Sequence, residues 1–111
     1  MRNEPGAAIV SACLPIAVIS AVNLAEVQSK LVGAGLKEQE AWWHIAEIGC
    51  ESVPFDEEQA RIAGGLARHP FPLALGDRAC LALAIQRNAT AYTTDAAWKN
   101  LGLGINITVI R

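Results

Sequence analysis

The sequence predicts a three-layer α/β fold, in which a parallel sheet carries helices on both faces. Short apolar segments rich in β-branched residues alternate with longer helical segments along the chain. No two-residue hairpin turn and no internal repeat interrupts this alternation. Such alternation is typical of βαβ units, whose parallel strands end at one edge of the sheet, where ligands usually bind.

Length and composition limit the kind of protein that the chain can form. With 111 residues, it is expected to form one domain over residues 1–111. Its hydrophobic fraction of 52% and charged fraction of 18% suit a packed core and argue against disorder. A net charge of −2 supplies no overall attraction for nucleic acid, so binding of nucleic acid would need a local feature.

The first half of the chain is expected to contain three helices and two strands. Prolines and glycines mark their ends, because proline interrupts a helix and glycine readily adopts the left-handed backbone of a helix end. The first elements are a helix over 4–14 that ends before Pro15 and a strand over 16–20. Two helices follow, one over 21–32 with Gly33 as its C-cap and one over 36–48 that Gly49 stops. The last element is a strand over 50–55, which Pro54 either ends or places at a sheet edge.

The second half continues the alternation. Asp56 is expected to be the N-cap of a helix over 57–68, since two acids follow it in the first turn. The segment 77–87 predicts a buried helix, because it is apolar on all sides after its first two residues. A strand over 90–94, a short helix over 95–100 and a final strand over 106–110 complete the pattern.

The sequence favours a soluble protein. Residues 5–25 carry no charge and approach the length of a membrane span, but Pro15 and several polar side chains interrupt them. The three cysteines are far apart and form no CxxC pair, so neither a zinc site nor a disulfide framework is expected. We therefore expect a cytoplasmic protein with reduced cysteines and no contact with a membrane.

Three carboxylates are expected at the edge where the strands end. Asp95 directly follows a predicted strand, and Asp77 begins the predicted buried helix. Glu26 lies early in its helix, from which its side chain leans back toward the helix N-terminus. Because like charges at close range repel one another, a divalent cation would stabilise the group. Oxygen ligands suit Mg²⁺ or Mn²⁺, which would activate water for attack on a phosphodiester.

Each of these acids, taken alone, also has a purely structural interpretation. Asp77 and Asp95 could be helix or turn caps, and Glu26 could be a solvated residue on a helix surface. Of the three acids, Glu26 fits a purely structural interpretation least well, because its immediate neighbours in the sequence are apolar.

Four segments of the sequence carry a family resemblance: ISAVNLAEVQSKL, VPFDEEQARIAGGL, LALGDRACLALA and AYTTDAAWKNLGLGINITVIR. In this order and spacing they resemble PIN domains, especially the VapC-like toxins of bacterial type II toxin–antitoxin systems, over nearly the whole chain. The resemblance implies a metal-dependent endoribonuclease in which Glu26, Asp77 and Asp95 are catalytic acids that coordinate Mg²⁺ or Mn²⁺. We also expect an RNA substrate, a cognate antitoxin as partner, and a homodimer.

The chain departs from this family at its beginning. Family members start with a short apolar strand that ends in Asp, followed by a helix that runs into a segment like NEPGA. Here RNEPGA occupies residues 2–7, and Glu4 is the only acid before Glu26. We therefore expect that the first central strand and its Asp are missing, through a mis-assigned start or a truncated gene. The alternative function is a catalytically incomplete module that only binds an antitoxin or associates with itself.

Other polar and aromatic residues have weaker expected roles. Ser20, Asn23 and Thr94 would lie at the same edge as the acids and orient a metal-bound water. Arg78 has two equally weighted roles, a contact with RNA phosphate or an ion pair with a nearby acid. Trp42 and its neighbour in the sequence point about 100° apart on their helix, so one is expected to pack inward and the other to lie nearer the surface. The outer one could belong to an antitoxin or dimer interface, but core packing is the favoured use.

Overall fold

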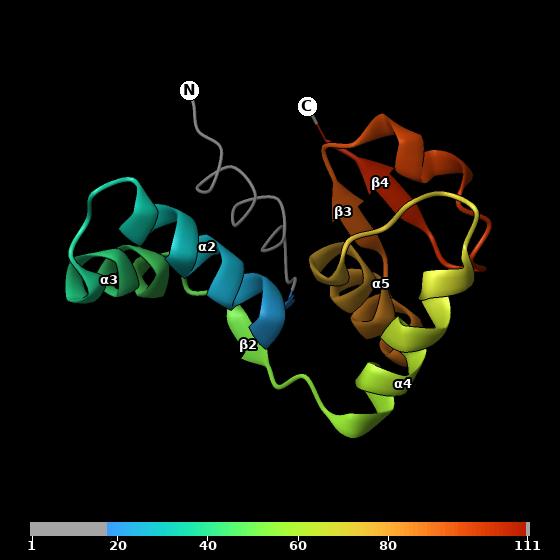
Figure 1. Cartoon of the computed structure of the whole chain (residues 1–111), viewed down its shortest axis with the longest axis horizontal. Helices are drawn as coiled ribbons and strands as arrows, with labels where there is room; N and C mark the ends of the chain where they lie inside the picture. The colour runs from blue at the N-terminus through green and yellow to red at the C-terminus, as the bar shows by residue number, and fades with distance from the viewer. Residues whose placement is uncertain (1–17, 111) are drawn as a thin grey trace.

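A computed structural model describes residues 18–110 as two pairs of parallel strands with helices packed beside them (Figure 1). The helix expected over 4–14 lies outside these described residues. The described elements are β1 (Val18–Ser20), α2 (Ala21–Gly33), α3 (Glu38–Ile48), β2 (Glu51–Val53), α4 (Glu57–Gly65), the 3₁₀ helix η1 (Leu66–Arg68), α5 (Leu75–Arg87), β3 (Ala91–Thr93), the 3₁₀ helix η2 (Ala96–Asn100) and β4 (Ile107–Val109).

The ends of α2 and α3 follow local chemistry. Ser20 is the N-cap of α2, because its hydroxyl accepts a hydrogen bond from the backbone N–H of Val22 at 3.2 Å. The prediction that Gly33 caps the helix is wrong, since Gly33 is its last residue and the left-handed turn falls at Gly35, with φ at 114°. The prediction that Gly49 stops α3 is confirmed by its φ of 76°.

The N-terminus of α4 agrees with the sequence, and its C-terminus does not. The Asp56 carboxylate accepts a hydrogen bond from the backbone N–H of Gln59 at 2.8 Å, which confirms Asp56 as the N-cap. The α-helical part ends at Gly65 and continues as a 3₁₀ turn, where the sequence predicts one helix to residue 68. Two consecutive glycines lower helix propensity at this point, and a 3₁₀ turn is common at a helix end.

The helix α5 begins two residues earlier than the sequence predicts. It starts at Leu75, so Asp77 is its third residue and not its first. The Asp77 carboxylate reaches back and accepts a hydrogen bond from the backbone N–H of Ala74 at 3.2 Å. Because Ala74 has no side-chain acceptor of its own, Asp77 performs the capping role from within the first turn.

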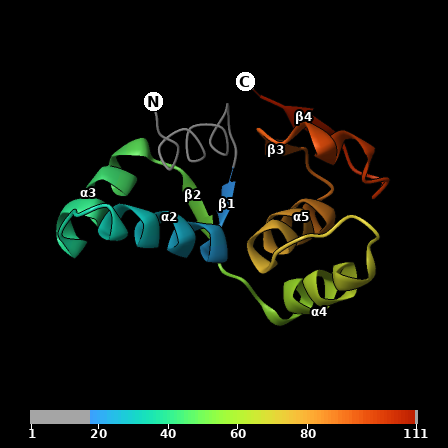
Figure 2. The ribbon, with the colours of Figure 1, turned by 45° about the horizontal axis from the view of Figure 1, so that its top comes forward.

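The strands are parallel, as the α/β class requires, but they form two separate sheets within residues 18–110. β1 pairs with β2, with Ser20 opposite Val53, and β3 pairs with β4, with Ala91 opposite Ile107. Figure 2 shows the first pair beside α2 and the second pair on the other side of the molecule. A sheet extends only through backbone hydrogen bonds along strand edges, and no described strand bridges β1 and β3. The one continuous sheet layer that the sequence predicts is therefore not found in this part of the chain.

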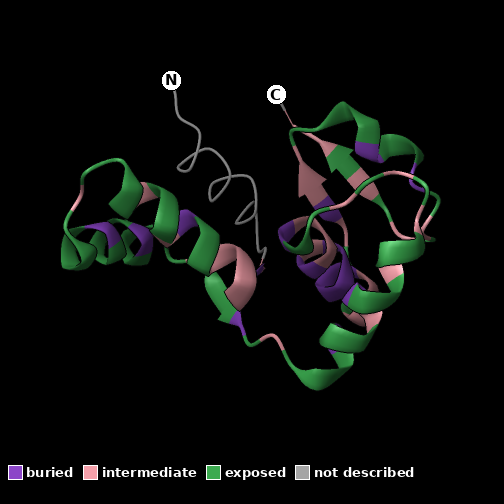
Figure 3. Cartoon of the chain, viewed as in Figure 1, coloured by how far each residue is buried: buried purple, intermediate pink, exposed green. Residues whose placement is uncertain are grey.

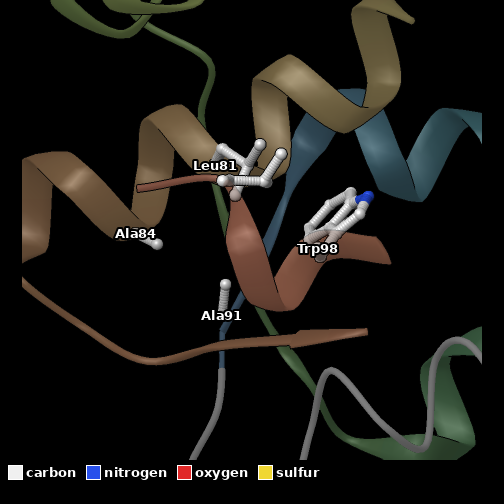
Figure 4. Close-up of a cluster of buried hydrophobic side chains, with 5 residues drawn as sticks. Leu81, Ala84, Ala91 and Trp98 are labelled. Carbon is white, nitrogen blue, oxygen red and sulfur yellow. The ribbon is translucent and has the colours of Figure 1, made fainter. Parts of the chain in front are cut away.

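The main hydrophobic core lies around α5, which confirms the prediction that this helix is buried. Figure 3 shows the buried residues concentrated on α5, and Leu81 is fully buried. Trp98 and the methyl groups of Ala84 and Ala91 join Leu81 in one cluster, together with Leu101 (Figure 4). α5 also contacts α4, α2, β1 and β3, so it connects the two halves of the molecule.

The two tryptophans of α3 are both exposed, with relative exposures of 49% for Trp42 and 59% for Trp43. The prediction that one of them packs inward is therefore wrong. α3 faces the protein through Ala41 and Ile45, which are one turn apart and buried. Residues 42 and 43 point away from that face, because successive helix residues are rotated by about 100°.

Cys50 takes part in a disulfide, contrary to the expectation of reduced cysteines, whereas Cys80 is a free thiol. The cysteine pattern therefore does not support the expectation of a cytoplasmic protein. Among residues 18–110, no helix has both the length and the apolar character needed to cross a bilayer.

Candidate functional site

The Glu26 side chain lies at the N-terminus of α5, against the glycine that precedes Asp77. The link is Asn23, whose side-chain amide donates to Glu26 Oε1 at 3.1 Å and to the backbone carbonyl of Gly76 at 2.9 Å. Gly76 is buried and immediately precedes Asp77 in the first turn of α5. The Glu26 carboxylate from α2 therefore lies against the turn of α5 that carries Asp77.

Gly76 makes room for this approach. A Cβ atom at this position would overlap the Glu26 carboxylate. Glycine in a helix lowers the stability of the helix by roughly 0.5–1 kcal/mol relative to alanine. The close approach of the Glu26 carboxylate explains why a glycine is nevertheless found here. Our interpretation of the sequence did not include Gly76. The signal in the sequence that could have identified it is a glycine directly before an acid at the N-terminus of an apolar helix.

Cys80 lies one helical turn after Asp77, and the charges of Asp77 and Glu26 both act on the pKa of its thiol. Burial raises the pKa of its thiol to about 11, and the negative charges of Asp77 and then Glu26 contribute in the same direction. Neither carboxylate forms an ion pair with a basic side chain within residues 18–110. The first turn of α5 thus carries a local negative charge that its neighbours in the described chain do not neutralise.

The raised pKa of Cys80 predicts a loss of stability at alkaline pH. The unfolded thiol ionises near pH 9.0, whereas the folded thiol ionises only near pH 11, so rising pH stabilises the unfolded chain first. The contribution is present below pH 9 and is lost between about pH 9 and 11. Urea denaturation across this range should show a smaller fall in the free energy of unfolding for Cys80→Ala than for the wild type. Equal falls would contradict the prediction.

Within the described residues, the hydrogen bonds of Asp95 include neither Glu26 nor Asp77. It directly follows β3 and caps η2, since its carboxylate accepts from the backbone N–H of Ala97 at 3.0 Å. Its own N–H donates to the Thr93 hydroxyl at 3.0 Å. No group of three or more His, Cys, Asp or Glu in residues 18–110 is arranged to hold a metal ion. Within residues 18–110, hydrogen bonds place Glu26 against the α5 turn that carries Asp77 and do not include Asp95. The metal roles of all three acids stay predictions.

The remaining predicted site residues have different surroundings. Ser20 is buried and its hydroxyl is engaged as the cap of α2, and Thr94 is exposed directly after β3. Arg78 turns toward α4, where its Nη1 donates to the carbonyl of Ala63 at 3.4 Å. Its Nε is buried without a hydrogen-bond partner in the described chain. The hydrogen bonding of Arg78 thus links α5 to α4 and includes no acid.

The donor chemistry of the Glu26–Asp77 pair fits a hydrated Mg²⁺ or Mn²⁺ ion. Mg²⁺ in proteins is commonly held by one or two carboxylates and keeps several of its water ligands. The positive end of the α5 dipole stabilises the carboxylates beside it and favours an approaching phosphate group. This chemistry would suit a cation held beside a phosphate group.

The parallel strands and the helices between them place the chain in the α/β class, in which ligands bind outside the carboxyl ends of the strands. The family is given by comparison: a model of the PIN domain matches residues 1–103, and the chain belongs to the PIN domain family. Members of this family are generally nucleases, typically use divalent metal ions, and often belong to toxin–antitoxin pairs. Neither the curated proteins nor the solved structures contain a match to the sequence.

Proposed function

We propose that this protein is a metal-dependent endoribonuclease that acts as the toxin of a toxin–antitoxin pair and hydrolyses RNA phosphodiester bonds. The observation that carries the proposal is the placement of the Glu26 carboxylate against the first turn of α5, beside Asp77, in a chain of the PIN domain family. A purely capping role would explain Asp77, but it would not explain why a second carboxylate approaches the same turn.

In this proposal Glu26 and Asp77 hold Mg²⁺ or Mn²⁺, with Asp95 as a third ligand. The bound ion would supply a water of lowered pKa and would neutralise charge on the phosphodiester. The backbone N–H groups in the first turn of α5 have no intrahelical acceptor, so they can orient a phosphate oxygen. Local attraction of this kind is needed, because a net charge of −2 gives the protein no general affinity for RNA.

The test is cleavage of a structured RNA by the purified full chain. We expect cleavage with Mg²⁺ or Mn²⁺, loss of cleavage in EDTA, and recovery when metal is added in excess. Asp95→Asn should lower the activity if Asp95 is a ligand, and it should leave the activity unchanged if Asp95 only caps η2. Cleavage that persists in EDTA, or no cleavage by folded protein with either ion, would overturn the proposal.

The second candidate is a module that binds an antitoxin or a second copy without catalysis. The exposure of Trp42 and Trp43 on α3 favours it, because aromatic side chains are enriched in protein–protein interfaces. The two candidates differ in metal affinity. Calorimetry that detects no binding of Mg²⁺ or Mn²⁺ to the folded chain would favour the second candidate.

A further inference from the structure

The side chain of Asn23 occupies the junction between α2 and α5. Its amide nitrogen donates to Glu26 Oε1 at 3.1 Å, three residues along α2, and to the carbonyl of Gly76 at 2.9 Å, 53 residues away in the sequence. An amide NH₂ group has two hydrogens, and both partners are acceptors. The reversed orientation would place the amide oxygen against these acceptors, so the orientation of the side chain follows from its surroundings.

Glu26 depends on this contact for its position. Its side chain is exposed, and within residues 18–110 its carboxylate accepts no other hydrogen bond. A long exposed side chain is conformationally free in solution. Within the described chain, the hydrogen bond from Asn23 is therefore the directional contact that keeps the carboxylate beside α5 before a cation binds.

We propose that Asn23 is a positioning residue that fixes the Glu26 carboxylate against Gly76, so that the metal site is formed before the ion arrives. This inference rests on the proposed function, in which Glu26 is a metal ligand. Asn23 acts through Glu26 and contacts neither the ion nor the RNA. Gly76 completes the arrangement, because it supplies the acceptor carbonyl and leaves the space that the carboxylate fills.

The first experiment measures Mn²⁺ affinity by calorimetry in the full chain. Asn23→Ala should weaken binding by about tenfold, as is common for residues that orient a metal ligand. In a Glu26→Ala background the same change should have no further effect, because Asn23 would have nothing left to position. Equal weakening in both backgrounds, or none in either, would overturn the inference.

Gln28→Ala is the matched control. Gln28 is also an amide on α2 that donates to a backbone carbonyl, that of Glu38 at 3.1 Å, but it lies on the α3 side of the helix. We expect wild-type Mn²⁺ affinity in this variant. A loss equal to that of Asn23→Ala would mean that the effect comes from α2 stability and would overturn the inference.

Gly76→Ala provides a second variant that should remain folded. Alanine is the better helix former, and the atom that it would meet belongs to a flexible exposed side chain that can swing away. The thermal midpoint should therefore not fall, whereas Mn²⁺ affinity should weaken by about as much as in Asn23→Ala. Wild-type affinity in Gly76→Ala would overturn the inference.

A readout without metal separates this inference from the proposed function. In NMR spectra of the metal-free chain, the side-chain amide protons of Asn23 should exchange slowly with solvent, and their shifts should change in Glu26→Ala. Shifts and exchange typical of a free amide would overturn the inference whatever the metal does. If the shifts behave as expected but Glu26→Ala binds Mn²⁺ like the wild type, the positioning holds and the metal role of Glu26 fails.

Discussion

An Asp77→Asn variant is expected to bind Mn²⁺ at least about tenfold more weakly than the wild type and to cleave RNA about 100-fold or more slowly. The amide oxygen can still accept the hydrogen bond that Asp77 receives from the backbone N–H of Ala74. It carries no charge, so it is a poorer ligand for a hard divalent cation. Calorimetry with Mn²⁺ and single-turnover RNA cleavage measure the two effects.

The fold should tolerate this substitution. Removing a negative charge from the N-terminal turn of a helix costs about 0.3–1 kcal/mol. The loss of function would therefore occur in a protein that still unfolds cooperatively in urea at a similar midpoint. A variant that cleaves RNA at the wild-type rate would contradict the assignment of Asp77.

Asp56→Asn is the matched control for Asp77→Asn. Asp56 is also a capping acid, at the N-terminus of α4, and its carboxylate accepts from the backbone N–H of Gln59 at 2.8 Å. The substitution changes the net charge by the same amount but removes no carboxylate from the α5 turn. We expect wild-type Mn²⁺ affinity and cleavage, and an equal loss in both variants would show that net charge alone is responsible.

Leu81→Ala is expected to lower the free energy of unfolding by about 2–5 kcal/mol. Leu81 is fully buried on α5, in a cluster that includes Ala91 of β3, Trp98 of η2 and Leu101 at the end of η2. Ala84 and Ala91 are too small to fill the cavity that the substitution leaves (Figure 4). Because small domains are stable by only about 5–15 kcal/mol, the change would remove a large part of the total.

Urea denaturation followed by circular dichroism measures this loss, with Leu75→Ala as the control. Leu75 begins the same helix, but 56% of its surface is exposed. The same substitution there should change the free energy of unfolding by no more than about 0.5 kcal/mol. Similar losses in the two variants would contradict the placement of the core around Leu81.

Much of the secondary structure could be predicted from the sequence, because its signals are local. Asp56 caps α4 as its acid-rich first turn indicates, and Gly49 ends α3 in the left-handed conformation. The apolar run after Arg78 predicted a buried helix, and α5 is the centre of the core. Local signals were less reliable where two residues could perform one role, as at Gly33 and Gly35 or at Ala74 and Asp77.

The composition of the candidate site was partly predictable, but its arrangement was not. Glu26, Asn23 and Asp77 were all expected at one edge, and the structure joins Glu26 and Asn23 to the α5 turn that carries Asp77. Gly76 was not predicted, because its importance depends on a carboxylate that arrives from a distant part of the chain. Asp95 was expected in the same group, but within the described residues its side chain and its N–H bond only to close neighbours in the sequence, Ala97 and Thr93.

The helices and strands, the parallel direction of the strands and the available carboxylates all follow from the sequence alone. Hydrophobic period, capping side chains and glycine placement act over a few residues, so they can be recognised without coordinates. The tertiary structure decided how the strands pair, which face of α3 is exposed, and which acids meet. These depend on contacts between segments far apart in the chain, such as Asn23 with Gly76, for which a single sequence carries no local signal.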